Sequence, residues 1–261
     1  MKLGPHGRLL GGTLTLLAGF FVFSSSIFSQ AHKRLQLTPA EYQNGEKRAL
    51  AAYRKALPAL RRHLSRQGAE LGDPIFLRAF KHERSLEVWV QPQGKGPYKL
   101  LKTYPIAAAS GNLGPKRREG DRQVPEGFYA VTTALLNPKS RYHLAMNVGY
   151  PNSYDRSLGR NGSFIMIHGS NVSAGCLAMT DPAIEEIYTL VAQALQKGQS
   201  SIPVHLFPFH LTSRNQAKFR SVYPQHQPFW QNLALGYSFF EARKKVPRVS
   251  SSEEGYWFDR E

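Results

Sequence analysis

Residues 164–176 read FIMIHGSNVSAGC, and this stretch decides the fold of the chain. Its first four residues are apolar and predict a buried strand, which ends at His168. A loop of small residues follows and ends at Cys176, the only cysteine among 261 residues. Asp181 and Pro182 come next and are typical of a helix start, with an N-cap before a proline at the first helical position. The order of strand, histidine, loop, cysteine and helix would hold an imidazole and a thiol close together on a rigid frame.

The lone cysteine has three interpretations, because a single cysteine cannot form a disulfide within its own chain. It is a small buried side chain beneath the helix, one half of an intermolecular bridge, or a free thiol kept for chemistry. His168 lies eight residues upstream and favours the third, since an imidazole can accept the thiol proton and later protonate a leaving amine. We therefore predict that Cys176 is a nucleophile and His168 its base.

The neighbours of this pair suggest supporting roles. The backbone N–H groups of Gly175 and Cys176 are suited to stabilise a tetrahedral oxyanion, since glycine lets the backbone approach a reacting group closely. Ser173 orients His168, contacts substrate or is simply a turn residue. No second histidine or carboxylate stands at ligand spacing near His168, so we predict no metal and no cofactor.

The first 31 residues have the pattern of a secretory signal peptide. Lys2 and Arg8 precede an uncharged, mostly apolar run over residues 9–23, and small residues at Ser29 and Ala31 fit cleavage after Ala31. The run is shorter than the ~20 residues that a membrane-spanning helix needs, although an uncleaved N-terminal anchor is the alternative. We expect an exported protein of the periplasm or cell envelope, with peripheral or N-terminal membrane contact as a further option.

The chain is strongly basic, with a formal net charge of +16. Inside a cell this balance would suggest nucleic acid, but no recognition helix, zinc-finger spacing or aromatic RNA-binding signature is present. Behind a signal peptide, anionic envelope polymers or lipid head groups are the expected partners. The alternative is a generally basic surface with no dedicated partner. We predict no binding of nucleic acid.

Residues 39–67 are expected to form a helix that lies on the domain after it. Apolar side chains recur at steps of three and four, opposite a row of arginines and lysines. The apolar positions are Leu50, Tyr53, Leu57, Leu60 and Leu64. Pro58 should kink or interrupt the helix.

From residue 75 onward, short β-rich runs are separated by Gly, Pro and Asn, as in a sandwich or barrel. The expected strands are residues 75–80, 86–90, 98–106, 128–132, 142–148, 164–168 and 202–207. One helix follows the cysteine, with Gly198 at its end. We therefore expect a mainly β fold with α additions. Its segments are a signal (1–31), a helical segment (32–73), a catalytic domain (74–212) and a C-terminal extension (213–261).

The C-terminal extension is rich in aromatic residues between Phe229 and Phe240 and then becomes basic. Its helix either packs on the catalytic domain, the default, or presents an amphipathic face to a membrane or partner. Residues 250–261 are expected to form a loosely ordered tail with a few anchoring aromatics.

The motif around His168 and Cys176 resembles the active site of the L,D-transpeptidase catalytic domain, the YkuD-type fold, and within that family the YafK-like branch. The likeness covers residues 74–212. Its further motifs are residues 104–106 (YPI), 110–116 (SGNLGPK), 119–121 (EGD), 125–129 (PEGFY), 137–144 (NPKSRYHL), 149–152 (GYPN) and 155–156 (DR).

The resemblance implies a β-barrel-like or sandwich domain that acts on peptidoglycan stem peptides. The cysteine would attack the carbonyl of the third stem residue, commonly meso-diaminopimelate, and the acyl group would pass to an amine or to water. By position, Cys176 matches the nucleophile and His168 the base, and Ser173 and Gly175 match the small residues before the cysteine. The YafK-like branch includes a hydrolase that detaches an envelope lipoprotein, so a peptidoglycan-linked lipoprotein is a second expected partner.

Two departures from the general family limit what can be transferred. The loop between histidine and cysteine is much shorter here, and Ala178 stands where an arginine usually follows the cysteine. Arg141, Arg156 or Arg160 could replace that cation in space, or each is an ordinary surface charge. Gly169, Tyr142, Tyr150 and Asp155 are further candidates for supporting the site or binding substrate. The short loop and the missing charge favour hydrolysis over crosslinking.

Other classes fit the sequence less well. In papain-like and NlpC/P60-type peptidases the cysteine normally precedes the histidine, whereas here His168 comes first. A sortase would need a Thr-Cys strand and a downstream catalytic arginine, and neither signature is present. A crosslinking transpeptidase and a non-catalytic, basic peptidoglycan-binding scaffold are the alternatives that stay open.

Overall fold

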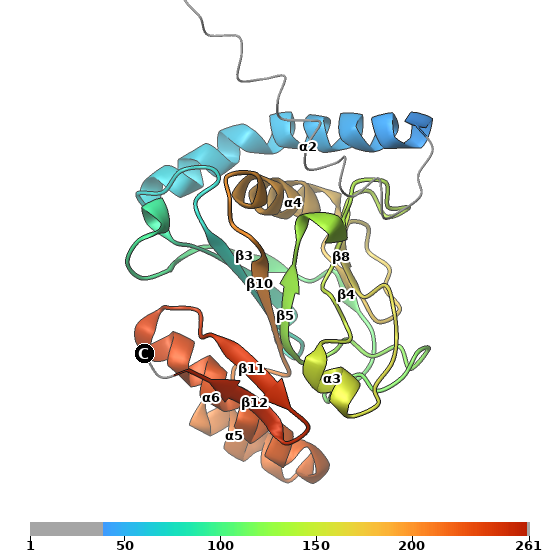
Figure 1. Cartoon of the computed structure of the whole chain (residues 1–261), viewed down its shortest axis with the longest axis vertical. Helices are drawn as coiled ribbons and strands as arrows, with labels where there is room; N and C mark the ends of the chain where they lie inside the picture. Colours follow the sequence, from blue (N-terminus) through green and yellow to red (C-terminus); the bar gives the residue numbers. More distant parts are fainter. Residues whose placement is uncertain (1–38, 260–261) are drawn as a thin grey trace, which may run out of the picture.

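The computed structural model describes residues 39–259 and contains two five-stranded mixed sheets and a separate hairpin (Figure 1). The first sheet has the order β3 (Lys99–Pro105), β2 (Ser85–Val90), β1 (Ile75–Phe80), β10 (Ile202–Phe207), β5 (Gly127–Val131). The second has the order β4 (Ala108–Ala109), β9 (Leu177–Ala178), β8 (Met166–His168), β7 (Ala145–Asn147), β6 (Leu136–Asn137). The hairpin joins β11 (Val249–Ser252) and β12 (Gly255–Phe258).

Five α-helices and three short 3-10 turns accompany the strands in the described part of the chain. The helices are α2 (Pro39–Arg66), α3 (Ser153–Ser157), α4 (Asp181–Gln196), α5 (Ser213–Arg220) and α6 (Gln227–Arg243). The turns are η1 (Pro92–Gly94), η2 (Thr133–Leu135) and η3 (Pro224–His226). The expected β-rich domain with a helix after the cysteine and helical segments at both ends is confirmed. The expected signal segment lies outside the described residues.

The predicted strand at residues 75–80 is the centre of the first sheet and is buried on both faces. It pairs in parallel with β10 and antiparallel with β2. Because side chains alternate along a strand, Ile75 and Leu77 join the core beneath α2 and α4, whereas Phe76 and Phe80 pack on the other face against aromatic residues of α6. Figure 1 shows the same layers, with α2 and α4 on one side of this sheet and α6 on the other.

Two predicted strands are shorter than expected. The strand expected over 142–148 is reduced to β7, and the strand expected over 164–168 is reduced to β8. His143 and Phe164 both have positive φ angles, 67° and 53°, which a regular strand does not permit. Phe164 is also 68% exposed, so the apolar run before His168 is buried only in part.

Helix α2 packs on α4, as the sequence predicted, but its most buried line of residues differs from the predicted one. Leu60 and Leu64 are buried, whereas Leu50, Tyr53 and Leu57 lie at the edge of the contact. Small residues form the rest of the line: Gly45, Ala49, Ala52 and Ala56. Pro58 lies on the exposed side within a helix that runs unbroken from residue 39 to 66, so the helix is not interrupted, although Figure 1 shows that α2 bends along its length.

The C-terminal helix α6 packs on the first sheet, as its default interpretation predicted. Trp230 and Phe240 are at most 1% exposed. Phe240 contacts Phe76 of β1, and Trp230 contacts Phe209, just after β10. Within residues 39–259, no helix has both the length and the apolar character needed to span a bilayer.

The expected loose tail is instead the hairpin of β11 and β12. Tyr256 is buried, and its backbone N–H and C=O are bonded to the side chain of Asn232 on α6 at 2.8 Å each. Its hydroxyl accepts a bond from Asn152 at 2.8 Å. These bonds fix the hairpin between α6 and the start of α3.

Candidate active site

Strands β8 and β9 place the segments that carry His168 and Cys176 side by side in the second sheet. The two strands are parallel, with Ile167 opposite Leu177 and His168 opposite Ala178. Continuing this register by one residue sets Cys176 beside Met166. Cys176 itself lies just before β9, and its Sγ contacts the backbone of the neighbouring chain, 3.4 Å from the Met166 nitrogen, two residues before His168.

The His168 ring is held by the carbonyl of the next residue. Its Nδ1 lies 2.5 Å from the carbonyl oxygen of Gly169. A carbonyl can only accept, so Nδ1 carries the proton and Nε2 is left as the basic nitrogen. Tyr142 packs against the ring, with centroids 4.8 Å apart. Burial lowers the pKa of His168, and the Gly169 carbonyl opposes part of that shift. The imidazole is therefore neutral, and Nε2 is the nitrogen that can accept a proton.

The thiol of Cys176 is partly buried beside the backbone of the strand that carries His168. The N–H of Met166 donates to Sγ at 3.4 Å, and Sγ lies 3.5 Å from the carbonyl oxygen of Phe164. Burial raises the pKa of the Cys176 thiol, while the Met166 N–H and the charge of Lys116 act in the opposite direction. The resting pair is a neutral thiol and a neutral imidazole, so the nucleophile forms when the proton moves.

Lys116 is a buried cation that the sequence-based search for a substitute arginine missed. Its side chain is 3% exposed, and its ammonium donates to Asp121 at 2.6 Å and to the carbonyl of Arg118 at 2.9 Å. Its charge stabilises the thiolate of Cys176. Arg160 pairs with buried Asp155, and Arg156 donates to the carbonyl of Pro151. Both arginines are thus engaged at α3.

The predicted oxyanion donors are occupied by two serine hydroxyls. The Cys176 N–H donates to Ser173 Oγ at 2.9 Å, and the Gly175 N–H donates to Ser110 Oγ at 2.6 Å. Ser173 also donates to the Cys176 carbonyl at 2.6 Å, which supports its interpretation as a turn residue. Gly175 has φ +103°, a conformation that favours glycine. The oxyanion hole at Gly175 and Cys176 stays a prediction, and it requires both hydroxyls to turn away.

Gly169 allows the loop after the histidine to pass close to α4. A Cβ on this residue would lie 2.6 Å from Asp181 Oδ1 and 2.8 Å from the Tyr142 carbonyl oxygen. Asp181 was predicted as the N-cap of the helix, but it is the first residue of α4 and Thr180 takes the cap position. The Asp181 carboxylate accepts from the Ser170 N–H at 2.8 Å instead, and so ties the loop to the helix.

The other predicted supporting residues divide into two groups. Tyr142 is 40% exposed beside His168 and borders the site, and Arg141 is an exposed neighbour with no hydrogen bond or ion pair to a described residue. Tyr150 and Asp155 are buried and structural. The Tyr150 hydroxyl donates to the backbone, and Asp155 accepts from Tyr129 at 2.9 Å.

Ser110 was missed because it is remote in sequence. Gly175 and Ser110 are 65 residues apart, and they meet because β4 pairs antiparallel with β9, with Ala109 opposite Leu177. The sequence carried one signal for this contact, the run at residues 110–116 that belongs to the family resemblance. That run did not indicate which loop it would contact.

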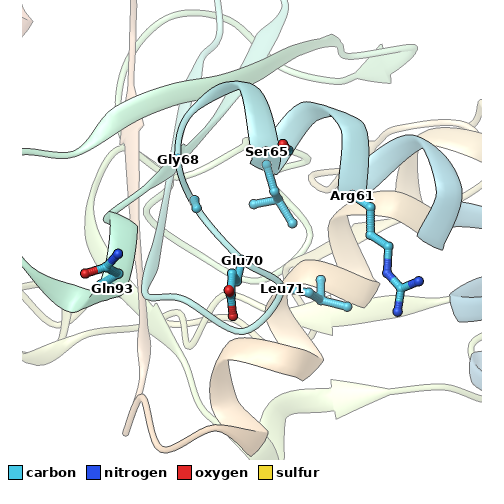
Figure 2. A pocket seen from close by; sticks show the side chains of 8 residues that line it. Arg61, Ser65, Gly68, Glu70, Leu71 and Gln93 are labelled. Carbon is cyan, nitrogen blue, oxygen red and sulfur yellow. The ribbon is translucent and has the colours of Figure 1, made fainter.

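A hollow at the end of α2 is separate from this site (Figure 2). Its labelled side chains come from α2, the turn after it and η1, and include Arg61, Ser65 and Glu70. None of its lining residues belongs to the loop between His168 and Cys176. Across residues 39–259, no cluster of three or more His, Cys, Asp or Glu side chains is arranged to hold a metal ion.

Comparison with known proteins identifies the family of the chain. The model of the L,D-transpeptidase catalytic domain, YkuD, matches residues 81–205. The chain is 44% identical over 180 residues to the Escherichia coli K12 protein named "Putative L,D-transpeptidase YafK", which covers 69% of this chain and 72% of that protein. The helical cell shape determining protein Pgp2 from Campylobacter jejuni aligns at 20% identity over 73% of this chain and 79% of its own, with a TM-score of 0.42. By its sequence similarity, the chain belongs to the L,D-transpeptidase catalytic domain family.

Proposed function

We propose that the protein is a cysteine enzyme that cleaves or transfers a peptide bond of peptidoglycan stem peptides. One observation carries the proposal: Nδ1 of His168 is committed to the Gly169 carbonyl, which leaves Nε2 as the basic nitrogen, and the Cys176 thiol lies against the same strand, 3.4 Å from the Met166 nitrogen. A histidine with a fixed tautomer beside a lone cysteine is what acyl transfer through a thioester requires. Membership of the family supplies the substrate class.

The proposed reaction has two steps. In the first, Nε2 of His168 takes the thiol proton, Sγ of Cys176 attacks the carbonyl carbon beside diaminopimelate, and the C–N bond breaks as the imidazolium returns the proton to the leaving amine. In the second, His168 takes a proton from water or an acceptor amine, which attacks the thioester; the C–S bond breaks, and the imidazolium returns the proton to Sγ of Cys176. Each step ends with a neutral imidazole at His168 and needs no cofactor.

Water is the proposed acceptor. The reaction is then hydrolysis of a stem peptide, or of the bond that joins the lysine of a lipoprotein to a stem peptide. Transfer needs an amine that is bound while water is excluded, whereas hydrolysis needs only access. Six residues lie between Gly169 and Cys176, which leaves little chain for a lid. Phe164, whose carbonyl lies beside Sγ, is 68% exposed. A partly open site is consistent with water as the acceptor.

The test is the fate of one acyl-enzyme. Purified protein is incubated with a tetrapeptide muropeptide and increasing concentrations of a diaminopimelate-containing acceptor, and products are identified by mass spectrometry. The proposal expects tripeptide to dominate at millimolar acceptor. A dominant crosslinked dimer would show that the enzyme is a transpeptidase proper. No product from this muropeptide, nor from one that carries lysine on diaminopimelate, would favour the non-catalytic scaffold.

Export to the periplasm or cell envelope is part of the proposal, because peptidoglycan lies there. Its support is the signal-like pattern of residues 1–31. Cell fractionation of an epitope-tagged chain tests it, with a variant lacking residues 2–31 as the control. Recovery of the full-length chain in the cytosol would contradict export.

A further inference from the structure

A hollow of about 400 Å³ opens beside the cysteine loop and has no part in the proposed chemistry. It lies between the β1–β2 turn, the segment after β4 and the end of α5. Ser110 lines this hollow, and the same hydroxyl accepts the Gly175 N–H at 2.6 Å. Through Ser110 the hollow contacts Gly175, the residue before the predicted nucleophile, on the β4 side of the loop.

The two walls of the hollow differ in character. One wall is apolar and belongs to the C-terminal region, with Phe219, Val222 and Tyr223. Val222 is 61% exposed and available for contact. The opposite wall is basic and carries Lys81 and Arg84. This combination suits a ligand with an anionic group next to aliphatic carbon.

Arg84 is the cation of this wall that is free to bind an anion. Lys81 is buried and already satisfied, because it pairs with Glu126 at 3.0 Å and donates to two backbone carbonyls. Arg84 is exposed and forms no ion pair with any residue in the described range 39–259. A guanidinium of this kind can bind a carboxylate with two parallel hydrogen bonds.

The position of Arg84 is fixed before any ligand arrives. Its φ of 51° sets it in the left-handed region at the β1–β2 turn. Its carbonyl accepts from the Ile106 N–H at 2.8 Å, and its guanidinium donates to the Ala107 carbonyl at 3.2 Å. Both bonds tie it to the segment that leads through β4 to Ser110. A side chain held in this way loses less conformational entropy on binding.

We propose that this hollow, the Arg84 pocket, binds a carboxylate of the stem peptide while the scissile carbonyl lies at Cys176. The proposal rests on the proposed function, since it assigns a subsite for the same substrate. A stem peptide carries more than one carboxylate, on D-glutamate, on diaminopimelate and at the terminal D-alanine. They share the chemistry that the pocket recognises, an anion flanked by aliphatic carbon.

Binding of the tetrapeptide L-Ala-γ-D-Glu-diaminopimelate-D-Ala to the full chain carrying Cys176→Ala tests the pocket, because this variant cannot consume the ligand. Adding Arg84→Gln should raise Kd about tenfold, the loss expected for one charge-assisted hydrogen bond. Arg214→Gln removes an equal charge from the exposed start of α5, outside the pocket, and should leave Kd within about twofold. Val222→Asp should weaken binding more than Val222→Ala, because it adds a like charge beside the ligand.

Three singly amidated tetrapeptides identify the carboxylate. The amide at the recognised position should bind about tenfold more weakly and should be insensitive to Arg84→Gln, since the pair is already broken. Three outcomes would overturn the proposed pocket. They are equal Kd values for Arg84→Gln and Arg214→Gln, three amides that bind as tightly as the acid, and no binding of the tetrapeptide at all. Turnover of the same tetrapeptide by the unmodified chain judges the proposed function separately. If the unmodified chain turns over the tetrapeptide but Arg84→Gln does not change its Kd, the proposed function is supported and only the pocket is contradicted.

Discussion

At the scale of single residues, burial disfavours the charged form of both members of the predicted catalytic pair. It lowers the pKa of the His168 imidazole and raises that of the Cys176 thiol. Below its pKa the imidazole is protonated and cannot accept the thiol proton. Since that pKa lies below the ordinary 6.5, we expect the acid limb of the kcat/KM profile to have its midpoint below 6.5.

His168→Ala should lower kcat/KM by roughly 10²–10⁴ and remove this acid limb, because no group is left to take the proton. His63→Ala on α2 is the control and should keep both the rate and the limb. An acid limb centred above 6.5, or one that survives in His168→Ala, would show that another group is the base.

Lys116→Gln should raise the pKa of the Cys176 thiol further, since the amide can still bond Asp121 but carries no charge to stabilise the thiolate. The rate of alkylation by iodoacetamide against pH measures this pKa. Lys116→Arg should restore the original profile, and Arg118→Gln, an exposed charge on the same loop, should not change it. If the midpoint of the alkylation profile is unchanged in Lys116→Gln, the charge of Lys116 does not act on the Cys176 thiol.

The sequence predicted the chemistry of the site better than its surroundings. His168 and Cys176 could be found because they are close in sequence and of reactive types. Ser110 and Lys116 could not, because their proximity to the cysteine loop depends on the pairing of β4 with β9 and on the folding of the loop after β4. The arginines proposed instead were chosen by charge alone, and two of them are engaged at α3.

At the scale of elements, propensity predicted most strands and both long terminal helices, and it failed where the backbone departs from regular angles. His143 and Phe164 have positive φ, which nothing in their residue types indicates, and each shortens a strand. In α2 the large apolar residues suggested one face, but close packing on α4 selects the alanine line beside it. Because alanine is small and only weakly apolar, the spacing of alanines in the sequence does not mark the buried face of a helix.

Helix α6 offers a matched pair of substitutions. Trp230 is 1% exposed, and its indole N–H donates to buried Glu126 at 2.8 Å. Trp230→Ala should lower the free energy of unfolding by about 3–5 kcal/mol, since it opens a cavity and leaves Glu126 short of a partner. Leu235→Ala on the same helix is the control, because Leu235 is 60% exposed, and it should change stability by less than about 0.5 kcal/mol. Urea unfolding measures both, and similar losses would contradict the packing of α6.

At the scale of the whole molecule, the C-terminal region is part of the domain core. Phe80 and Phe207 of the first sheet share one cluster with Trp230 of α6 and Tyr256 of the hairpin. The sequence suggested a tail here because residues 250–261 are short and polar between their aromatics. It could not show that Asn232 and Asn152 would bind Tyr256 and convert that tail into a hairpin. The same region supplies the apolar wall of the Arg84 pocket.

The most direct test of the central claim is the mass of the peptide that contains Cys176 after acid quench of a reaction with a tetrapeptide muropeptide. Acid preserves a thioester, and the chain has no other cysteine to share the label. The predicted result is an increase equal to the mass of the muropeptide less D-alanine, found in the unmodified chain and absent from Cys176→Ala, which should turn over no substrate. Turnover by Cys176→Ala, or turnover by the unmodified chain with no adduct at any quench time, would contradict a covalent intermediate on Cys176.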